Sequence, residues 1–472
     1  MIHPKGKISD IQLRFNGAET DLVDNKIQMN VRFGKMEETL PASWIEDGAS
    51  KKEIEVGYTK IKEDIYGFSS SDKVSGKTIV IDPVPTRLWG TFYGDDENYG
   101  SNEFGGSTTD LLGNNYLVGS TSVPNSSYAT SGAHQTTIGN PQSMAPDGII
   151  VKFSSSGLRL WSSYYGGEGY DRIKAVRTDS QNNVVIVGQT NSTTKISTLG
   201  SYQTSFSGYD DAFLVKFNSS GVRLWGTYYG GRDEDGAYGV DIDKNDNIFM
   251  VGYFSINHST NIFDTPIGDR FITKFNPNGT IVWNKLYGGK GTDEFRSVKV
   301  GENFIAVGGL SYSTDNISTP GVFQENLYYT NNLSNDGIVF KLNLNGDRIW
   351  STYYGGESGE KIHAIEIDDE NNIYVGGETT SSNNIASPSS FDDYNSYSWT
   401  GFLAKLDQNG QRLWGTYLGY DTIIYSLAFT NNSIYVGGNG GIDNSITTLC
   451  AYKRTGMAGG YIGKFSKLGS LI

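Results

Sequence analysis

Short stretches of alternating apolar and polar residues, separated by turns, run through most of the chain. Residues 239–243 and 248–252 alternate on either side of the turn Lys244–Asn247, and two further stretches flank the turn Asn276–Gly279. A period of two is the pattern of a half-buried β-strand, and short turns join antiparallel neighbours. No sustained apolar pattern of helical period is present. The pattern therefore predicts an all-β protein built from four-stranded antiparallel units.

The four-stranded unit is repeated, and its last strand carries the same segment each time. Copies of this segment begin at residues 87, 159, 223, 281, 348 and 412, as in RLWGTYYGG at Arg223. Its tryptophan and leucine should point to opposite faces of the strand and pack between neighbouring units. Two other signatures recur with it: a Val-Gly pair that ends the second strand, at Gly119, Gly188, Gly252, Gly308, Gly376 and Gly437, and a lysine in the third strand, at Lys152, Lys216, Lys274, Lys341, Lys405 and Lys464. We expect these lysines to be structural, with the aliphatic stem along the sheet.

Repeated sheets with apolar faces need neighbours on both sides, and radial closure supplies them. Four-stranded units arranged in this way form a β-propeller. Six units predict a six-bladed propeller over residues 87–472. The last unit has almost no fourth strand, so we predict that residues 87–94 pair beside residues 460–466 or their continuation and close the ring. The alternative is a seventh blade supplied by residues beyond Ile472.

Several of these segments resemble the bacterial β-propeller repeat family called SBBP. The resemblance rests on RIWSTYYGG (348–356), the D..N.YVGG.T pattern of the following strand pair, ISTPGVFQ (317–324) and DAFLVKF (211–217). It covers about residues 87–472. The resemblance implies export and a surface or extracellular role, and it implies no enzymatic activity.

Residues 8–86 are similar to the β-rich domain that often precedes these repeats in secreted Bacteroidetes proteins, best at residues 11–19, 41–44 and 77–84. Independently, alternation in this region suits a small antiparallel sheet or sandwich, which we predict over residues 1–86. Pro83 and Pro85 mark the junction. The N-terminus has no apolar signal segment, and members of this family usually extend further at both ends, so we expect a trimmed chain.

Composition narrows the range of partners. The formal charge is −14 without a basic stripe, which argues against nucleic acid and favours cations or neutral sugars. The single cysteine, Cys450, excludes an intrachain disulfide. No run approaches 18 apolar residues, so we expect no membrane span, and we expect a monomer.

In up-and-down blades, the long second loops and the crossings between blades share one face, and the tight turns share the other. The long loops are rich in Ser, Thr and Asn with interspersed aromatics, and Tyr394, Tyr397 and Trp399 are the ligand-binding candidates among them. The open alternative is that these loops pack together and shield the edges of the blades.

A carboxylate stands ten residues after four of the tryptophans, as Asp171, Asp235, Asp293 and Glu360; the same offset gives Tyr99 and Ile424 in the first and last units. These carboxylates could attract a ligand near the channel mouth, or they could accept backbone hydrogen bonds in the crossing loops. Asp241, Asp243 and Asn245 alternate as calcium ligands do, yet they lack the turn glycine and the distal Glu. We therefore expect no cofactor, with calcium as the alternative.

No catalytic motif is present. The four histidines (His3, His134, His258, His363) stand in different units, and no G-x-S-x-G, H-E-x-x-H or P-loop occurs. The leading hypothesis is a non-enzymatic secreted or cell-surface module that binds a glycan or protein through its long-loop face. A carbohydrate hydrolase or lyase would need two carboxylates, or a Tyr–Arg pair, facing each other at the axis. The third hypothesis is a passive spacer.

Overall fold

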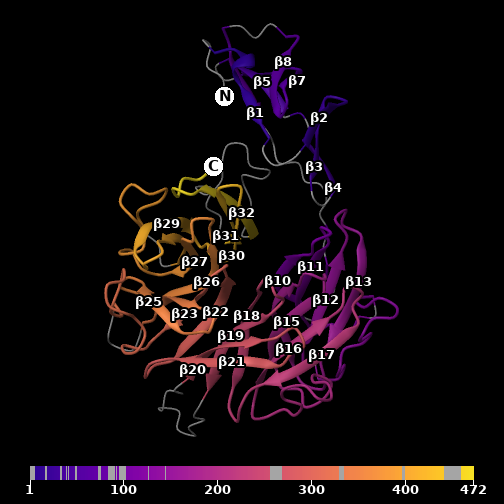
Figure 1. Cartoon of the computed structure of the whole chain (residues 1–472), viewed down its shortest axis with the longest axis vertical. Helices are drawn as coiled ribbons and strands as arrows, with labels where there is room; N and C mark the ends of the chain where they lie inside the picture. Colours follow the sequence, from indigo (N-terminus) through magenta and orange to yellow (C-terminus); the bar gives the residue numbers. More distant parts are fainter. Residues whose placement is uncertain are drawn as a thin grey trace. The chain divides into compact units, whose positions relative to one another are not determined.

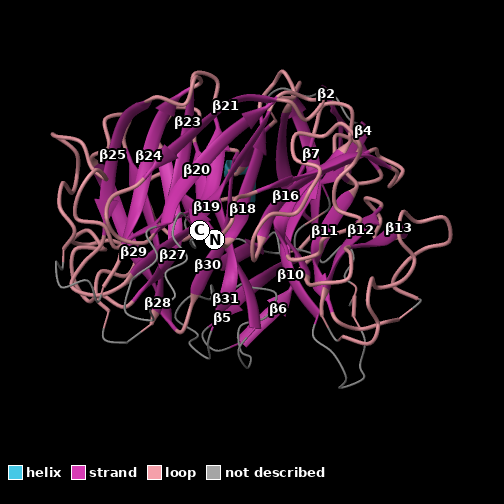
Figure 2. Ribbon diagram, turned by 90° about the horizontal axis from the view of Figure 1, so that it is seen from below, coloured by secondary structure: helices cyan, strands magenta, loops and turns pink. Residues whose placement is uncertain are grey.

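The computed structural model describes residues 6–472 apart from 16–18, 32–33, 39, 41, 48–49, 73–75, 83–90, 92, 95–101, 126, 144, 256–267, 329–333, 396–398 and 441–458. The described part of the chain consists of strands and loops with a single short 3-10 helix, Ile8–Asp10 (Figure 2). None of the described helical structure is long and apolar enough to cross a membrane. The chain divides into two compact units, one formed mainly by residues 1–88 and the other by residues 89–446 and 455–472.

The N-terminal unit contains three small antiparallel sheets in place of one continuous sheet. Their strand orders are β1(Gln12–Arg14)-β8(Ile65–Ser70)-β7(Val56–Lys62), β2(Glu19–Val23)-β3(Lys26–Val31)-β4(Gly34–Glu38) and β6(Ser50–Glu53)-β5(Ala42–Asp47)-β9(Thr78–Asp82). The alternating residues of these strands supply a common apolar core that includes Ile27, Ile45, Tyr58, Tyr66 and Ile79.

The second unit is a series of antiparallel sheets in which the strands follow one another in chain order. Five sheets have four strands each. The first two contain β10(Asn102–Thr109), β11(Asn115–Thr121), β12(Asp147–Phe153) and β13(Arg159–Tyr165), and β14(Asp171–Thr178), β15(Val184–Thr190), β16(Asp211–Phe217) and β17(Arg223–Tyr229). The next three contain β18(Asp235–Ile242), β19(Ile248–Ser255), β20(Gly268–Phe275) and β21(Ile281–Tyr287); β22(Asp293–Val300), β23(Phe304–Ser311), β24(Asp336–Asn343) and β25(Arg348–Tyr354); and β26(Glu360–Ile367), β27(Ile373–Thr379), β28(Thr400–Leu406) and β29(Arg412–Tyr420). A sixth sheet contains β30(Ile423–Thr430), β31(Ser433–Gly440) and β32(Gly459–Ser466). The first strands lie around a common axis and the last strands lie at the rim (Figure 1), so we call them inner and outer strands.

This arrangement is that of a β-propeller, and the all-β fold predicted from the alternation is confirmed. The number of blades stays a prediction, because the proposed closing segment 87–94 lies largely outside the described residues. Tyr93 is described, and its hydroxyl donates to the carbonyl of Tyr128 at 2.6 Å while its ring meets Phe153 edge-on at 6.1 Å. Tyr165 makes the equivalent contacts with Ile196 and Phe217 of the next sheet, at 2.7 Å and 5.7 Å. Tyr93 therefore contacts the first blade in the same way that the outer-strand tyrosine Tyr165 contacts the second blade.

The repeated tryptophans and lysines join each blade to the next. The Trp350 indole N–H donates to the carbonyl of Gln408, in the last tight turn of the following blade, at 2.7 Å, and Lys341 Nζ donates to the same carbonyl at 3.1 Å. Trp161 and Lys152 bind the carbonyl of Ser219 in the same way. The leucines beside the tryptophans behave differently from the expectation: Leu160, Leu224 and Leu413 are 45%, 48% and 51% exposed, because the rim strand leaves that face uncovered.

Candidate functional site

Every inner strand is interrupted by one β-bulge. The register between strands β14 and β15 skips Lys174, since Ile173 opposes Gly188 and Ala175 opposes Val187. The skipped residues in the six sheets are Gly105, Lys174, Tyr238, Arg296, His363 and Tyr425. The bulge brings the carbonyl of Arg172 so close to Gly188 that a β-carbon on this glycine would lie 1.9 Å from the oxygen. The glycine in the second strand is thus required by the bulge in the first.

The bulged side chains meet one another near the axis. Arg296 Nη1 lies 3.3 Å from His363 Nδ1, and the guanidinium lies over the Tyr238 ring, 5.4 Å from its centroid. The rings of His363 and Tyr425 are 5.3 Å apart. Lys174 is close enough to Arg296 for their charges to interact. We call Lys174, Tyr238, Arg296, His363 and Tyr425 the axial cluster.

Two carboxylates hold the cationic side chains of this region in place. Glu294 binds Arg296 at 2.7 Å, and Glu378 binds Lys361 at 2.9 Å. Burial acts to raise the pKa of Glu378, but hydrogen bonds from His363 and Lys361 and the charge of Lys361 lower it, so this carboxylate is ionised. Burial lowers the pKa of His363, so its ring is neutral near pH 7. Since Nδ1 accepts from Arg296, the ring proton is on Nε2, which faces Glu378 at 3.6 Å.

A second layer of charges lies three residues further along the inner strands, toward the tight turns. Arg177 donates to Asp241 at 3.1 Å, and Lys299 pairs with Glu366 at 3.0 Å. Asp241 also accepts the backbone N–H of Val300 at 2.8 Å. All four charges of this layer are therefore neutralised by one another across the inner strands.

The calcium candidates do not come together as ligands. Asp241 points into the layer just described, whereas Asp243 holds its own tight turn by accepting the N–H groups of Asn245 and Asn247 at 2.9 Å. Within the described part of the chain, no group of three or more His, Cys, Asp or Glu side chains is placed to hold a metal ion.

One aromatic candidate of the fifth blade, Trp399, lies near Lys361, the partner of Glu378. Trp399, just before β28, is 46% exposed, and Lys361 Nζ lies 5.9 Å from its ring centroid. Tyr394 is 70% exposed, and Tyr397 lies outside the described residues. With Tyr425 at 50% exposure, this side of the axis presents accessible aromatic faces next to charged groups.

Comparisons with known proteins identify both parts of the chain. Residues 1–84 match the model of a domain of unknown function, DUF7948, and residues 349–385 match the SBBP β-propeller repeat. The repeat match falls on the outer strand, inner strand and second strand of adjoining blades. The chain is an SBBP-type β-propeller repeat protein.

Other similarities are more distant. An uncharacterized WD repeat-containing protein of Acanthamoeba polyphaga mimivirus is 24% identical over 200 residues, which is 36% of this chain and only 14% of the viral protein. Sqt1 from Chaetomium thermophilum is similar in structure with a TM-score of 0.39 and 10% identity, over 78% of this chain and 70% of that one. The WD40 domain of Neurospora crassa Pan2 gives a TM-score of 0.32 and 8% identity, over 68% and 82% of the two chains.

The long loops of the SBBP propeller lie along the outer strands. In the fourth blade, Thr319 N–H donates to the carbonyl of Ser351 at 2.9 Å, and Tyr353 N–H donates to the carbonyl of Gln324 at 3.1 Å. Loops 128–135, 196–204 and 385–393 make the same pair of backbone bonds in their own blades. They satisfy the free edge of the rim strand, as an exposed edge requires. This is the arrangement of the shielding alternative, and Trp399, at the inner end of its loop, stays exposed.

The four carboxylates predicted as ligand-binding residues are fully buried at the start of the inner strands. Asp171 accepts from Gly167 N–H at 2.8 Å, Thr190 Oγ1 at 2.5 Å and Ser192 Oγ at 2.8 Å. Asp235, Asp293 and Glu360 bind the equivalent N–H of Gly231, Gly289 and Gly356. Asp293 also binds Arg270 at 2.9 Å. They hold the crossings between blades and do not face the axial cluster.

Burial raises the pKa of three of these groups, of Asp171 to about 6, of Asp235 to about 7 and of Glu360 to about 8. In the first and last blades, the offset of ten residues from the tryptophan selects Tyr99 and Ile424, which are not the structural equivalents of these carboxylates. By strand register the equivalent residues are Asn102 and Thr422, and Thr121 Oγ1 donates to Asn102 at 2.6 Å as Thr379 does to Glu360.

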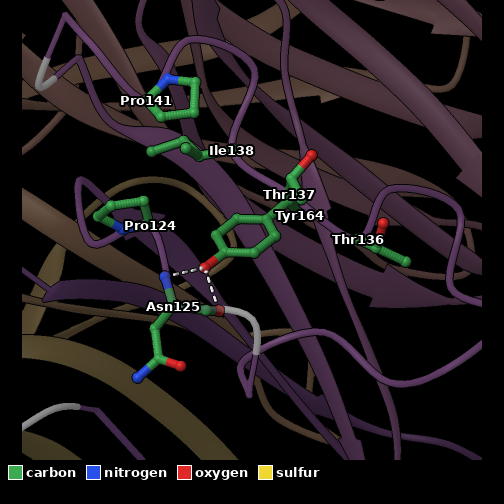
Figure 3. Close-up of a pocket in the computed structure, with 7 residues that line it drawn as sticks. All are labelled: Pro124, Asn125, Thr136, Thr137, Ile138, Pro141 and Tyr164. Atoms are coloured by element: carbon green, nitrogen blue, oxygen red, sulfur yellow. Dashed lines mark hydrogen bonds between the residues drawn. The ribbon is translucent and has the colours of Figure 1, made fainter.

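A separate small pocket of about 220 Å³ lies within the long loop of the first blade (Figure 3), lined by Pro124, Asn125, Thr136, Thr137, Ile138, Pro141 and Tyr164. Its polar groups are already used, because the Tyr164 hydroxyl donates to the carbonyl of Asn125 and accepts from its N–H. The pocket is smaller than the roughly 300 Å³ at which typical ligand sites begin.

The axial cluster was missed from the sequence, although a signal for it exists. A recurring glycine marks the point of each second strand where the neighbouring inner strand bulges. It is the Val-Gly glycine in the first three blades (Gly119, Gly188, Gly252) and the glycine after it in the next three (Gly309, Gly377, Gly438). Counting across the hairpin from Gly188 leads to Lys174, and from Gly377 to His363. The glycine opposite each bulge therefore shows which residue of the inner strand lies at the axis.

Proposed function

We propose that this SBBP propeller is a secreted or cell-surface binding module that recognises a glycan at its axis. The observation that carries the proposal is that the residues joining the blades are repeated, whereas the bulged residues differ from blade to blade. The residues that join the blades recur from unit to unit, whereas the bulged positions read Gly, Lys, Tyr, Arg, His and Tyr in turn. The layer three residues further along also varies, but its charges neutralise one another. The bulged positions have no such mutual pairing throughout, and a single asymmetric ligand gives a reason for their variety.

The chemistry of the cluster suits a hydroxyl-rich ligand. Tyr425 and Trp399 offer half-exposed aromatic faces, and the apolar face of a sugar ring packs on such surfaces. Arg296, Lys361 and Glu378 are already oriented by one another, so they can bind hydroxyl groups with little loss of side-chain entropy. Export to the surface belongs to the proposal and rests on the resemblance to repeat proteins that are secreted.

The proposal predicts that aromatic side chains on the axial side carry the affinity. After a glycan array has identified a ligand, Trp399→Ala and Tyr425→Ala should each weaken its binding by about 2 kcal/mol or more, roughly 30-fold, as is usual for aromatic anchors. The matched control is Asn278→Ala, which changes an exposed residue of a tight turn on the opposite face. Titration calorimetry measures all three. If Asn278→Ala weakens binding and the two aromatic variants do not, the binding face is wrongly assigned.

One arrangement favours a second candidate, a lyase that acts on an acidic sugar. The hypothesis calls for a deep axial pocket with a Tyr–Arg pair facing each other, and its candidate pair is Arg296 with Tyr238, since Arg296 lies over the Tyr238 ring and contacts His363. An arginine can neutralise a carboxylate next to the carbon that loses a proton, and a tyrosine or histidine can take that proton. Incubation with acidic oligosaccharides separates the two functions, because elimination produces an unsaturated sugar with ultraviolet absorbance and binding alone does not. A ligand bound without such a product excludes the lyase for that ligand.

A further inference from the structure

Two cations on the second inner strand, β14, have no ionic partner. Arg296 is neutralised by Glu294 and Lys361 by Glu378, and the layer toward the tight turns is neutralised within itself. Among the described residues, Lys174 and Arg172 form no ion pair. Arg172 lies over the Tyr170 ring, 5.1 Å from its centroid. The carboxylate of Glu103 offsets part of this charge, so two cations face one nearby anion within a chain whose formal charge is −14.

The surroundings of Lys174 make this charge unfavourable in the empty protein. Burial lowers the pKa of Lys174, the charge of Glu103 opposes this effect, and Arg172 and Arg296 lower it further. A half-buried ammonium without a partner gains free energy when an anion binds beside it, because that anion replaces the lost hydration.

Access to Lys174 is provided by the neighbouring inner strand, β10. The bulged residue there is Gly105, which is exposed and places no side chain at this layer. Its Cα is so near the chain of Lys174 that a β-carbon would lie 3.4 Å from the Lys174 carbonyl oxygen. Five blades contribute a side chain to the axial cluster, and the first places only the backbone of Gly105 beside Lys174.

We infer that Lys174, with Arg172 nearby on the same strand and Tyr238 and Tyr425 as the aromatic members of the axial cluster, binds the anionic group of an acidic saccharide. This inference rests on the proposed function and specifies its ligand class. The anionic group can be a carboxylate or a sulfate, since a lysine acts as a point charge toward either. The aromatic residues and the paired charges then contact the sugar rings, as they would for a neutral glycan.

The test uses titration calorimetry on the full chain with three probes: trigalacturonate, its methyl ester, and a sulfated galactose oligomer. Trigalacturonate or the sulfated oligomer should bind at least about tenfold tighter than the methyl ester, by the usual strength of charge-assisted hydrogen bonds. The carboxylate and sulfate arms show which anion the site prefers. Lys174→Met should remove the preference for the acidic probe, and Lys174→Arg should restore much of it.

Lys244→Met is the matched control, because Lys244 is an exposed lysine of a tight turn away from the axis. It should leave all affinities unchanged. Equal binding of the ester and the acidic probes, or a preference that survives in Lys174→Met, overturns the inference while the proposed function stands. If the wild type binds none of the three probes, the inference is also overturned, and the glycan array then decides the proposed function by itself.

Discussion

Pairs of buried carboxyl groups connect successive blades at the residue scale. Asp336 of β24 and Glu360 of β26 are both fully buried, and a β-carbon on Gly355 would lie 2.7 Å from Asp336 Oδ1 and 2.5 Å from Glu360 Oε2. Burial raises the pKa of Asp336 to about 7 and that of Glu360 to about 8. The same arrangement recurs in two other pairs, Asp147 with Asp171 and Asp211 with Asp235, and all four of these pKa values are raised by burial.

These pairs predict that the protein is more stable in mild acid than at alkaline pH. A carboxyl group with a raised pKa keeps its proton in the folded state after the unfolded chain has released it, so the free energy of unfolding falls as pH rises from about 4 to about 8. Each pKa unit corresponds to about 1.4 kcal/mol per group. Carboxylates with a lowered pKa, such as Asp368, lose their contribution only near or below pH 4 and do not mask this trend. Urea unfolding at pH 5.5 and pH 8 measures it, and a flat or rising profile contradicts it.

Substituting two different buried aspartates distinguishes the repulsion within the Asp336–Glu360 pair from the general effect of removing a negative charge. Asp336→Asn retains an acceptor for Gln324, gives Glu360 a donor, and should raise the free energy of unfolding at pH 8 by roughly 1 kcal/mol or more. Asp368→Asn instead deprives Lys405 of its 2.9 Å partner, and breaking such a buried pair costs about 3 kcal/mol. Destabilisation by both changes would show that the Asp336–Glu360 pair does not carry the penalty.

At the scale of elements, the contact between an outer strand and the next tight turn determines how blades stack. Gly410 adopts a φ of 81°, and a β-carbon there would lie 3.0 Å from the Trp350 indole. Gly221, Gly279 and Gly469 lie on Trp161, Trp225 and Trp414 in the same way. The glycine thus adopts the positive φ that the turn requires, and its lack of a side chain allows the indole to pack against it.

A pair of glycine variants measures this stacking contact. Gly321 has the same φ of 81° but nothing within 4 Å of its would-be β-carbon. Gly321→Ala should cost only the left-handed backbone conformation, about 1–2 kcal/mol. Gly410→Ala should cost that amount and roughly 1–3 kcal/mol more, because the methyl group pushes the indole away. Equal losses in denaturant unfolding would mean that the Trp350 contact adds nothing to blade stacking.

The sequence was informative where structure follows from local pattern. Strand alternation, the glycines that end tight turns and the recurring tryptophan all predicted elements that the structure contains. The sequence was less informative where the role of a residue depends on how its strand pairs with the neighbouring strand. The fixed offset from the tryptophan selected Ile424, although Thr422 is the structural equivalent, because the crossings between blades differ in length. Lys174 and His363 were not predicted as axial residues, because a bulge reverses the face on which alternation places them and only the glycine opposite the bulge marks them in the sequence.

At the scale of the whole propeller, stability depends on every blade having two neighbours. Each of the inner strands β14, β18, β22 and β26 packs against the inner strand on either side, and the apolar residues of adjacent sheets form shared cores such as that of Ile173, Val176, Phe213 and Phe217. The sixth sheet has only three strands among the described residues. A fourth strand there would cover the apolar face that now ends at Phe465 and Leu471.

Truncation tests whether residues 87–94 provide this strand. Removing residues 1–84 deletes the N-terminal unit and spares the segment, whereas removing residues 1–94 deletes both, along with the contacts of Tyr93 to Tyr128 and Phe153. We expect the first truncation to keep the propeller transition of the full chain and the second to melt roughly 10 °C lower, given about 2–4 °C per kcal/mol for a domain of 150–250 residues. Differential scanning calorimetry of the two truncated chains compares them directly. If they melt alike, residues 87–94 do not close the ring and the closure prediction is overturned.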